Sequence, residues 1–269
     1  MPPFWPLLPV GIKLVSEGLV AEAGSLPVGI VAVDPAGSIP LILVDPGYQR
    51  RGIGTGLLEA ALGQARAGGA STVAAGSGGA AYIWPGVPRD LPAAVGFFAT
   101  RGWQHTHDTV DLVADLAHHR APAGALERAA STGIQIVRAA SADLPSVNAF
   151  EAATFPSWIR WFADASPAEI LLARDRSGGI AGALLLDGPG ADTVLAPMLG
   201  PAAGTIGCVG VAPARHGQGI GTALVVRASE ILRHADVRIC HIGWTTRESF
   251  YRRTGYKPWR RYAMFSSPA

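Results

Sequence analysis

The sequence has 269 residues, of which 49% are apolar and 16% charged, and its mean hydropathy is +0.26. This composition excludes an intrinsically disordered chain, because enough apolar surface is present to offset the entropy lost on ordering. The net charge is only +2 and no run of Lys and Arg is longer than two, which argues against nucleic acid as the main partner. The length predicts about two domains.

Cysteine content and hydropathy bear on the compartment. Two cysteines, Cys208 and Cys240, cannot make a disulfide framework in a chain this long, which favours a reducing cytoplasm. The first ten residues contain four prolines and no basic residue, unlike a signal peptide. Two uncharged runs, residues 67–88 and 193–214, have the length of a membrane span. Glycine and proline interrupt both, so we expect no membrane partner.

In chain order, the first half begins its recognisable elements with a strand that ends at Val44. A helix is expected to begin near Ile53, and a strand is expected over residues 110–113. A stretch rich in Pro, Gly and Ala follows and reads as a linker. We therefore expect an N-terminal domain over residues 1–120, a linker over 121–133 and a C-terminal domain over 134–269.

The second half alternates strands with helices. Apolar residues recur at helical spacing from Ile220 to Leu232 and predict one buried helix face. The other expected helices cover residues 142–155, 158–163 and 247–254. The expected strands cover residues 134–138, 170–173, 180–186, 205–211, 237–242 and 258–265. This alternation predicts an α/β fold with a mixed sheet.

An internal repeat is the most informative feature of the sequence. Residues 44–58 resemble residues 211–225 without a gap, and residues 97–103 resemble residues 250–256. The two pairs follow in the same order, at offsets of 167 and 153 residues. Only 48 residues precede the first glycine motif, so the first copy is expected to lack the opening strand and two helices of the unit.

Each repeat contains a glycine-rich turn between a strand and a helix. Such a turn presents backbone N–H groups at the positive end of the helix dipole and thereby forms an anion site. Gly52 and Gly54 allow close approach of a phosphate, and the neighbouring Arg50 and Arg51 add positive charge. The spacing fits neither a dinucleotide-binding motif nor a P-loop, because position 57 is Leu and no Gly-Lys-Ser/Thr occurs.

These motifs resemble the GCN5-related N-acetyltransferases (GNAT superfamily) in a tandem two-domain form. The family signature is Gln/Arg-x-x-Gly-x-Gly/Ala after a strand. Gln49-x-x-Gly52-x-Gly54 matches it, and His216-x-x-Gly219-x-Gly221 matches with His in the first place. The resemblance implies two tandem acyl-CoA N-acyltransferase domains, the first abbreviated, which pair as an internal pseudo-dimer. It also implies acetyl-CoA as cosubstrate.

The resemblance further implies which residues hold acetyl-CoA. The turn amides would bind its diphosphate, and an amide of the preceding strand would polarise the thioester carbonyl. The residues expected to bind the cofactor are Val44, Gln49, Arg50, Arg51, Gly52, Gly54 and Thr55 in the first half, and Val209, Val211, His216, Gly217, Gln218, Gly219, Gly221 and Thr222 in the second.

The resemblance implies direct acetyl transfer, in which a tyrosine protonates the departing thiolate. Tyr251 occupies that place, and its alternative is a packed helix aromatic. The counterpart in the first half is Phe98, which has no proton to give, so catalysis is expected in the second half. The base stays open among His241, Glu248, Glu151 and a water chain. Each side chain also has a plain reading as a core histidine, an ion pair or an exposed face.

Other polar and aromatic groups are weaker candidates. Cys208 and Cys240 are expected to be inert buried thiols on the two strands that flank the pantetheine channel in this family. The aromatic residues Trp158, Trp161 and Phe162 either shape the acceptor site or pack in the core. The spacing of His105, His107, Asp108 and Asp111 fits no strong metal-ligand pattern, so no metal is expected.

The sequence therefore predicts an acetyl-CoA-dependent N-acetyltransferase that acts on a primary amine of a small molecule. Two alternatives stay open. One is a non-catalytic acyl-CoA-binding or scaffold protein, and the other is an acetyltransferase of proteins or peptides.

Overall fold

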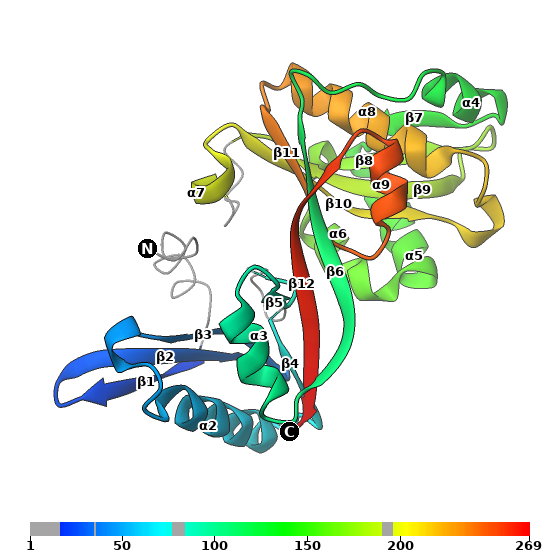
Figure 1. Ribbon diagram of the computed structural model, residues 1–269. Helices are drawn as coiled ribbons and strands as arrows, with labels where there is room; N and C mark the ends of the chain where they lie inside the picture. Colours follow the sequence, from blue (N-terminus) through cyan, green and yellow to red (C-terminus); the bar gives the residue numbers. More distant parts are fainter. Residues whose placement is uncertain (1–16, 35, 77–83, 190–195) are drawn as a thin grey trace. The chain divides into compact units, whose positions relative to one another are not determined.

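The structure is a computed structural model that describes residues 17–34, 36–76, 84–189 and 196–269. The chain divides into two compact units (Figure 1). Unit 1 consists of Met1–Val110 together with Arg260–Ala269, and unit 2 consists of Asp111–Trp259. These ranges differ from the domain boundaries expected from the repeat, because each unit includes a strand segment from the other half of the sequence.

Unit 1 is built on a sheet with the strand order β1-β2-β3-β4-β12-β6, and β5 pairs with β12. The first three strands form an antiparallel meander, and α2 connects β3 to its parallel neighbour β4. The elements of unit 1 in chain order are β1 (Glu17–Ala23), β2 (Leu26–Asp34), β3 (Ser38–Val44), the short 3-10 helix η2 (Pro46–Tyr48), α2 (Ile53–Ala67), β4 (Thr72–Ala75), β5 (Val87–Pro88), α3 (Pro92–Ala99) and β6 (Gln104–Asp115).

The core of unit 1 forms between α2 and the sheet. α2 contributes Leu57, Leu58, Ala61 and Ala65, which recur at helical spacing and are all buried. The last strand of the chain, β12 (Lys257–Pro268), contributes Phe265 to the same core. Unit 1 therefore depends on residues that come last in the sequence.

Unit 2 has the strand order β6-β11-β10-β9-β8-β7. Its elements in chain order are α4 (Ala125–Ser131), β7 (Gln135–Arg138), η3 (Ser141–Asp143), α5 (Leu144–Thr154), η4 (Pro156–Trp158), α6 (Ile159–Asp164), η5 (Pro167–Glu169), β8 (Ile170–Arg174), β9 (Ile180–Asp187), α7 (Ala196–Leu199), β10 (Ala203–Val211), η6 (Pro213–Arg215), α8 (Ile220–His234), β11 (Ile239–Thr245) and α9 (Glu248–Arg253). The structure confirms the predicted mixed α/β fold with its alternating strands and helices.

Helices cover both faces of the sheet in unit 2. Ile170, Leu172 and Ala183 pack in one apolar cluster with residues of α5 and α6. Gly182 points to the opposite face because side chains alternate along a strand, and there it meets Leu224 of α8. The sheet between these layers carries the strands on which the candidate site is built.

Two details of the predicted second half need correction. The segment 121–133, expected to be a linker, contains α4, whose Ala125 and Ala129 are buried and which packs against α8. The strand expected over residues 237–242 instead runs from Ile239 to Thr245. Val237 belongs to the turn after α8, because its N–H donates to the Leu232 carbonyl.

Unit 1 begins, within the described residues, with the counterpart of β8 rather than of β7. β1, β2 and β3 correspond in order to β8, β9 and β10, and the helix after each set starts at the glycine turn. No helix in the described part of the chain is long and apolar enough to cross a membrane.

Candidate functional site

The first residue of each glycine motif closes the end of the preceding strand. In unit 1, the Gln49 side chain donates from Nε2 to the Val44 carbonyl at 3.0 Å. In unit 2, His216 Nε2 lies 2.9 Å from the Val211 carbonyl, which is the corresponding position. The His in place of Gln therefore preserves the local contact, so the departure from the family pattern does not alter the turn. Arg215, beside it, pairs with Asp175 at 3.1 Å.

The glycines of the turns have two different roles. Gly52 and Gly219 precede their helices with φ of 85° and 77°, a left-handed conformation that strains other residues. Gly54 and Gly221 instead permit close packing, because a Cβ there would lie 3.3 Å from the Phe97 ring and 3.4 Å from the Phe250 ring. The two units thus share one construction at this point.

Both helix starts leave backbone donors open. The amides of residues 50–55 and of residues 217–222 donate no backbone hydrogen bond within the described chain. These ranges cover most of the residues expected to hold a diphosphate. In unit 2 they lie at the start of a helix of 15 residues, α8, whose dipole favours an anion.

The strands that precede and follow α8 separate from one another in unit 2. β10 and β11 are parallel, but they pair only at Ala203–Thr205 with Ile239–His241, although β10 continues to Val211. On its other side β10 bulges against β9 between Gly207 and Gly210, and Cys208 in the bulge has φ of 49°. A bulge takes residues out of the regular ladder. Val209, expected to supply an amide to the thioester, lies in it.

Tyr251 is buried on α9 beside this strand. Its side chain is 7% exposed. Burial, and then the charge of Cys208, raise the pKa of the Tyr251 phenol above its usual value. The phenol therefore stays protonated at neutral pH near the bulge of β10, as a proton donor requires.

Unit 1 has a different side chain at the corresponding place. Phe98 is buried and packs against Trp103 and Phe265, with ring centroids 5.0 Å and 5.9 Å apart. The guanidinium of Arg101 donates to Thr55 Oγ1 at 2.7 Å, on the first turn of α2. Arg51 donates to the Gly47 carbonyl. Unit 1 thus combines a basic helix start with no hydroxyl in the place of Tyr251.

His241 is held inside unit 2 by Asp111 of β6. His241 Nε2 lies 3.2 Å from Asp111 Oδ2, and both side chains are buried. The second carboxylate oxygen accepts the Trp244 N–H at 2.8 Å, where the backbone has φ of 51°. The His241 ring also contacts Trp259 edge-on. This pair fixes β11 beyond the point where it leaves β10, and sequence spacing did not reveal Asp111 as the partner.

We expect Asp111→Ala to destabilise unit 2. It leaves a buried imidazole and a strained N–H without their acceptor, and breaking a buried pair in this way costs about 3–5 kcal/mol. Chemical denaturation monitored by Trp fluorescence should show the loss, whereas Asp108→Ala on the exposed part of the same strand should change stability little. Equal effects of the two variants would contradict the assignment.

Glu248 and the cysteines have local partners. Glu248 accepts from Arg252 one turn later on α9 at 3.2 Å, the ion pair that sequence spacing allowed. Cys240 accepts from the Tyr256 hydroxyl at 3.2 Å. Burial raises the pKa of both Cys208 and Cys240 to about 12, so neither thiol is activated as a nucleophile.

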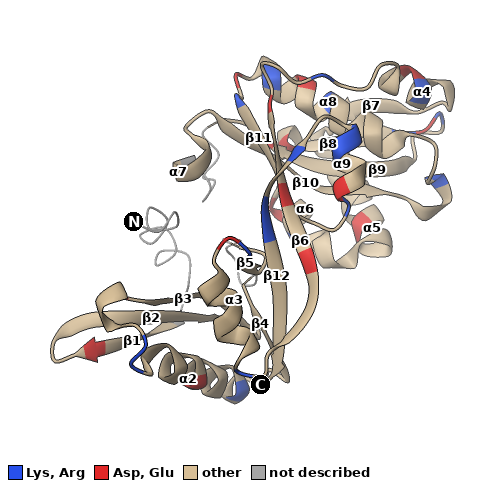
Figure 2. Cartoon of the chain, in the orientation of Figure 1, with Lys and Arg blue, Asp and Glu red and all other residues tan. Residues whose placement is uncertain are grey.

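Glu151 is the acidic residue of α5 (Figure 2) and is fully buried. Neither of its carboxylate oxygens accepts a hydrogen bond from a described residue. Burial raises the pKa of Glu151 to about 8. The charges of Glu151 and Asp187 both act on Cys208, so these carboxylates lie near the bulge of β10. The reading of Glu151 as an ordinary exposed face is therefore wrong.

The raised pKa predicts how the stability of the protein depends on pH. The folded state holds the Glu151 proton more tightly than the unfolded chain does, so the free energy of unfolding should fall as pH rises from about 4.5 to about 8. Thermal melts of the wild type should show this decline, and Glu151→Gln should reduce it. A loss of 1 kcal/mol corresponds to roughly 2–4 °C in a chain of this size. An unchanged decline in the variant would contradict the prediction.

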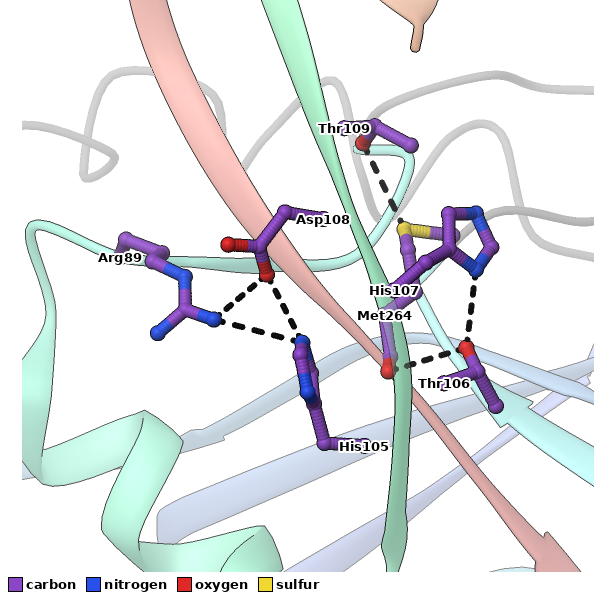
Figure 3. A network of polar contacts seen from close by, with 7 residues as sticks. All are labelled: Arg89, His105, Thr106, His107, Asp108, Thr109 and Met264. Atoms are coloured by element: carbon purple, nitrogen blue, oxygen red, sulfur yellow. Dashed lines mark hydrogen bonds and ion pairs between the residues drawn. The ribbon is translucent and has the colours of Figure 1, made fainter.

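The four residues considered as metal ligands do not come together. In unit 1, Asp108 Oδ1 accepts from Arg89 at 2.5 Å and lies 2.8 Å from His105 Nε2 (Figure 3). His107 is directed instead toward Thr106. Asp111 belongs to the buried pair in unit 2. Among the described residues, no three His, Cys, Asp or Glu side chains form a group that could hold a metal ion.

The aromatic residues after α5 form a stack. Phe155 and Trp158 lie with ring centroids 4.8 Å apart and nearly parallel. Phe162 is buried in the cluster between α5, α6 and the sheet, whereas Trp161 lies under the guanidinium of Arg160. Phe162 is thus a core residue, and Phe155 and Trp158 lie at the end of the helix that carries Glu151.

A bulged strand, a parallel neighbour that separates from it and an open helix start together define an acyltransferase-type fold, present here in two copies. The acetyltransferase (GNAT) domain model matches residues 15–105 and 166–258, so the chain belongs to this family, whose members use acetyl-CoA as cosubstrate. The match to both halves confirms the tandem arrangement.

Several known proteins are similar over most of the chain. A mycothiol acetyltransferase of Clavibacter sepedonicus is 28% identical over 219 residues, which are 76% of this chain. The chain spans 62% of the length of that relative. The GCN5-related glucosamine N-acetyltransferase region of a fungal multi-domain GH3 β-N-acetylglucosaminidase has a TM-score of 0.88 and 28% identity, over 97% of this chain and 34% of that one.

A tandem GNAT protein from the clavulanic acid biosynthesis pathway has the same fold. Its TM-score is 0.65 at 20% identity, over 94% of this chain and 84% of that one.

Proposed function

We propose that the chain is an N-acetyltransferase that transfers acetyl from acetyl-CoA directly to a primary amine of a small molecule, and that unit 2 carries the reaction. The observation that supports this most is the conjunction of three features in unit 2. These are the open amides at the start of α8, the separation of β10 from β11 and the protonated Tyr251 beside the bulge.

Each feature has a part in the reaction. The amides of residues 217–222 would hold the diphosphate, and the thioester would lie between the separated strands, where an amide of the bulge near Val209 can stabilise the oxyanion. The amine nitrogen attacks the thioester carbon, the carbon–sulfur bond breaks, and Tyr251 gives its proton to the departing sulfur. The phenol oxygen regains a proton from the nitrogen.

The second candidate function, acyl-CoA binding without turnover, fits unit 1. Its helix start has the same open amides and a basic surrounding of Arg50, Arg51 and Arg101, but Phe98 cannot protonate a thiolate. We propose that unit 1 pairs with unit 2 in the manner of a pseudo-dimer and does not catalyse transfer.

The proposed function is tested by acetyl-CoA-dependent release of free thiol. The names of the relatives favour D-glucosamine as the first acceptor, followed by other small amines and by peptides. We expect turnover by the wild type with an amine, and calorimetric binding of acetyl-CoA that Gly221→Glu weakens, because a larger side chain at this position displaces Phe250. Binding of acetyl-CoA without thiol release from any acceptor would favour the non-catalytic alternative.

A further inference from the structure

One face of α5 lies against the bulged strand. Val147, Glu151 and Phe155 follow at intervals of four residues and therefore share a side of the helix. Val147 packs in the cluster that also includes Cys208, and the Phe155 ring fills the space of a side chain at Gly210, 2.4 Å from where its Cβ would be. Glu151, between these two contacts, is thus directed toward the bulge.

Three oxygen atoms on this face have no hydrogen-bond donor. They are Oε1 and Oε2 of Glu151 and Oδ1 of Asn148, which lies one turn earlier on the same side. All three are buried, and none accepts a hydrogen bond from the residues that the structure describes. Buried acceptors without donors are rare in folded proteins because they lose their hydration without compensation.

The charged groups on the elements around α5 do not neutralise Glu151. On α6, Arg160 and Asp164 are exposed, and Arg160 lies over Trp161. Asp143 in η3 is paired with Arg174. The groups that act together near Glu151 are the acid Asp187 of β9, which accepts from Thr205, and the neutral thiol Cys208 of β10. The surroundings therefore have acceptors and negative charge but lack a cation.

We propose that Asn148 and Glu151 form the receiving site for the amino group of the acceptor, which is therefore a primary alkylamine that arrives as an ammonium ion. An alkylammonium has three N–H donors, the number needed by the three oxygens. No group on a neutral alcohol or thiol supplies three donors and a positive charge. This inference rests on the proposed function, because it places the acceptor beside the strand that would bind the thioester.

The same residues then account for the first proton of the reaction. The ammonium N–H bond breaks, its proton goes to a carboxylate oxygen of Glu151, and the nitrogen keeps the electron pair with which it attacks the thioester carbon. The second proton lost by nitrogen ends on the coenzyme A sulfur through Tyr251. Glu151 later releases its proton to water, so one proton is released per acetyl group transferred.

Steady-state kinetics test this assignment. In the wild type, kcat/KM for D-glucosamine or ethanolamine should rise with pH through about 8, the pKa of Glu151. Glu151→Gln should lower kcat/KM by about 10²–10⁴-fold and remove the rise. Aniline, which is uncharged at neutral pH, should be affected less. Glu127→Gln, an exposed acid on α4, is the matched control and should leave the profile unchanged.

The result that would overturn the inference is a Glu151→Gln enzyme with the wild-type pH profile and wild-type preference for alkylamines over aniline. Binding of acetyl-CoA by the variant, measured by calorimetry, shows that unit 2 is folded. Failure of the proposed function is a separate result, since it would appear as absence of acetyl-CoA binding or of thiol release in the wild type.

A binding measurement tests the site without turnover. Calorimetry of D-glucosamine with the wild-type protein saturated with coenzyme A should detect binding that is absent with D-glucose, which lacks the amino group. Asn148→Leu and Glu151→Gln should each weaken this binding by at least about tenfold. Equal binding by wild type and both variants, or no binding of D-glucosamine and ethanolamine to the wild type, would overturn the assignment.

Discussion

Replacing Tyr251 with Phe should lower the rate of acetyl transfer by about 10²–10⁴-fold, the usual contribution of a positioned general acid. The hydroxyl is the only part removed, and the ring stays in its buried position next to Phe250, where the centroids lie 4.8 Å apart. Binding of acetyl-CoA should therefore persist. The measurement is single-turnover thiol release at saturating acetyl-CoA.

Two controls separate proton donation from packing. Phe98→Tyr adds a hydroxyl at the corresponding place in unit 1 and should leave the rate unchanged if unit 2 carries the reaction. A better leaving group needs less protonation, so a thioester with a more acidic thiol should reduce the effect of Tyr251→Phe. Full activity of Tyr251→Phe with acetyl-CoA would show that another group protonates the sulfur.

The second large effect concerns stability. Phe265→Ala should destabilise unit 1 by about 3–5 kcal/mol, which is a large part of the roughly 5–15 kcal/mol by which proteins are stable. Phe265 is 4% exposed, stacks on Phe98 and lies opposite Ala75 in the pairing of β12 with β4. The substitution therefore leaves a cavity in the centre of the unit.

Hydrogen exchange provides the measurement, because a chain with two units need not unfold in one step. Amides of β2, β3 and β4 should lose protection in Phe265→Ala, whereas the neighbouring, partly exposed Ser266→Ala should keep it. Removal of Arg260–Ala269 should have a still larger effect on the same amides, since unit 1 then loses a paired strand. Unchanged protection after this truncation would refute the assignment of the strand to unit 1.

Features that depend on neighbouring residues could be predicted from the sequence. The glycine turns, the helices that follow them, and the pairing of Tyr251 with Phe98 as counterparts all arise from short motifs. Their structure is set by local hydrogen bonds and backbone conformation, such as the bond from Gln49 or His216 to the preceding strand. Repetition of the motifs in one order was enough to predict a tandem fold.

Contacts between distant residues were decided only by the tertiary structure. The spacing of Asp111 and His241 contains no sign that they meet, and the burial of Glu151 depends on how α5 packs over the bulge of β10. The boundaries of the units also escaped prediction, because β6 and β12 each contribute residues to both. Local sequence determines which elements form and which groups they carry, whereas burial and pairing over a hundred residues or more depend on the whole folded chain.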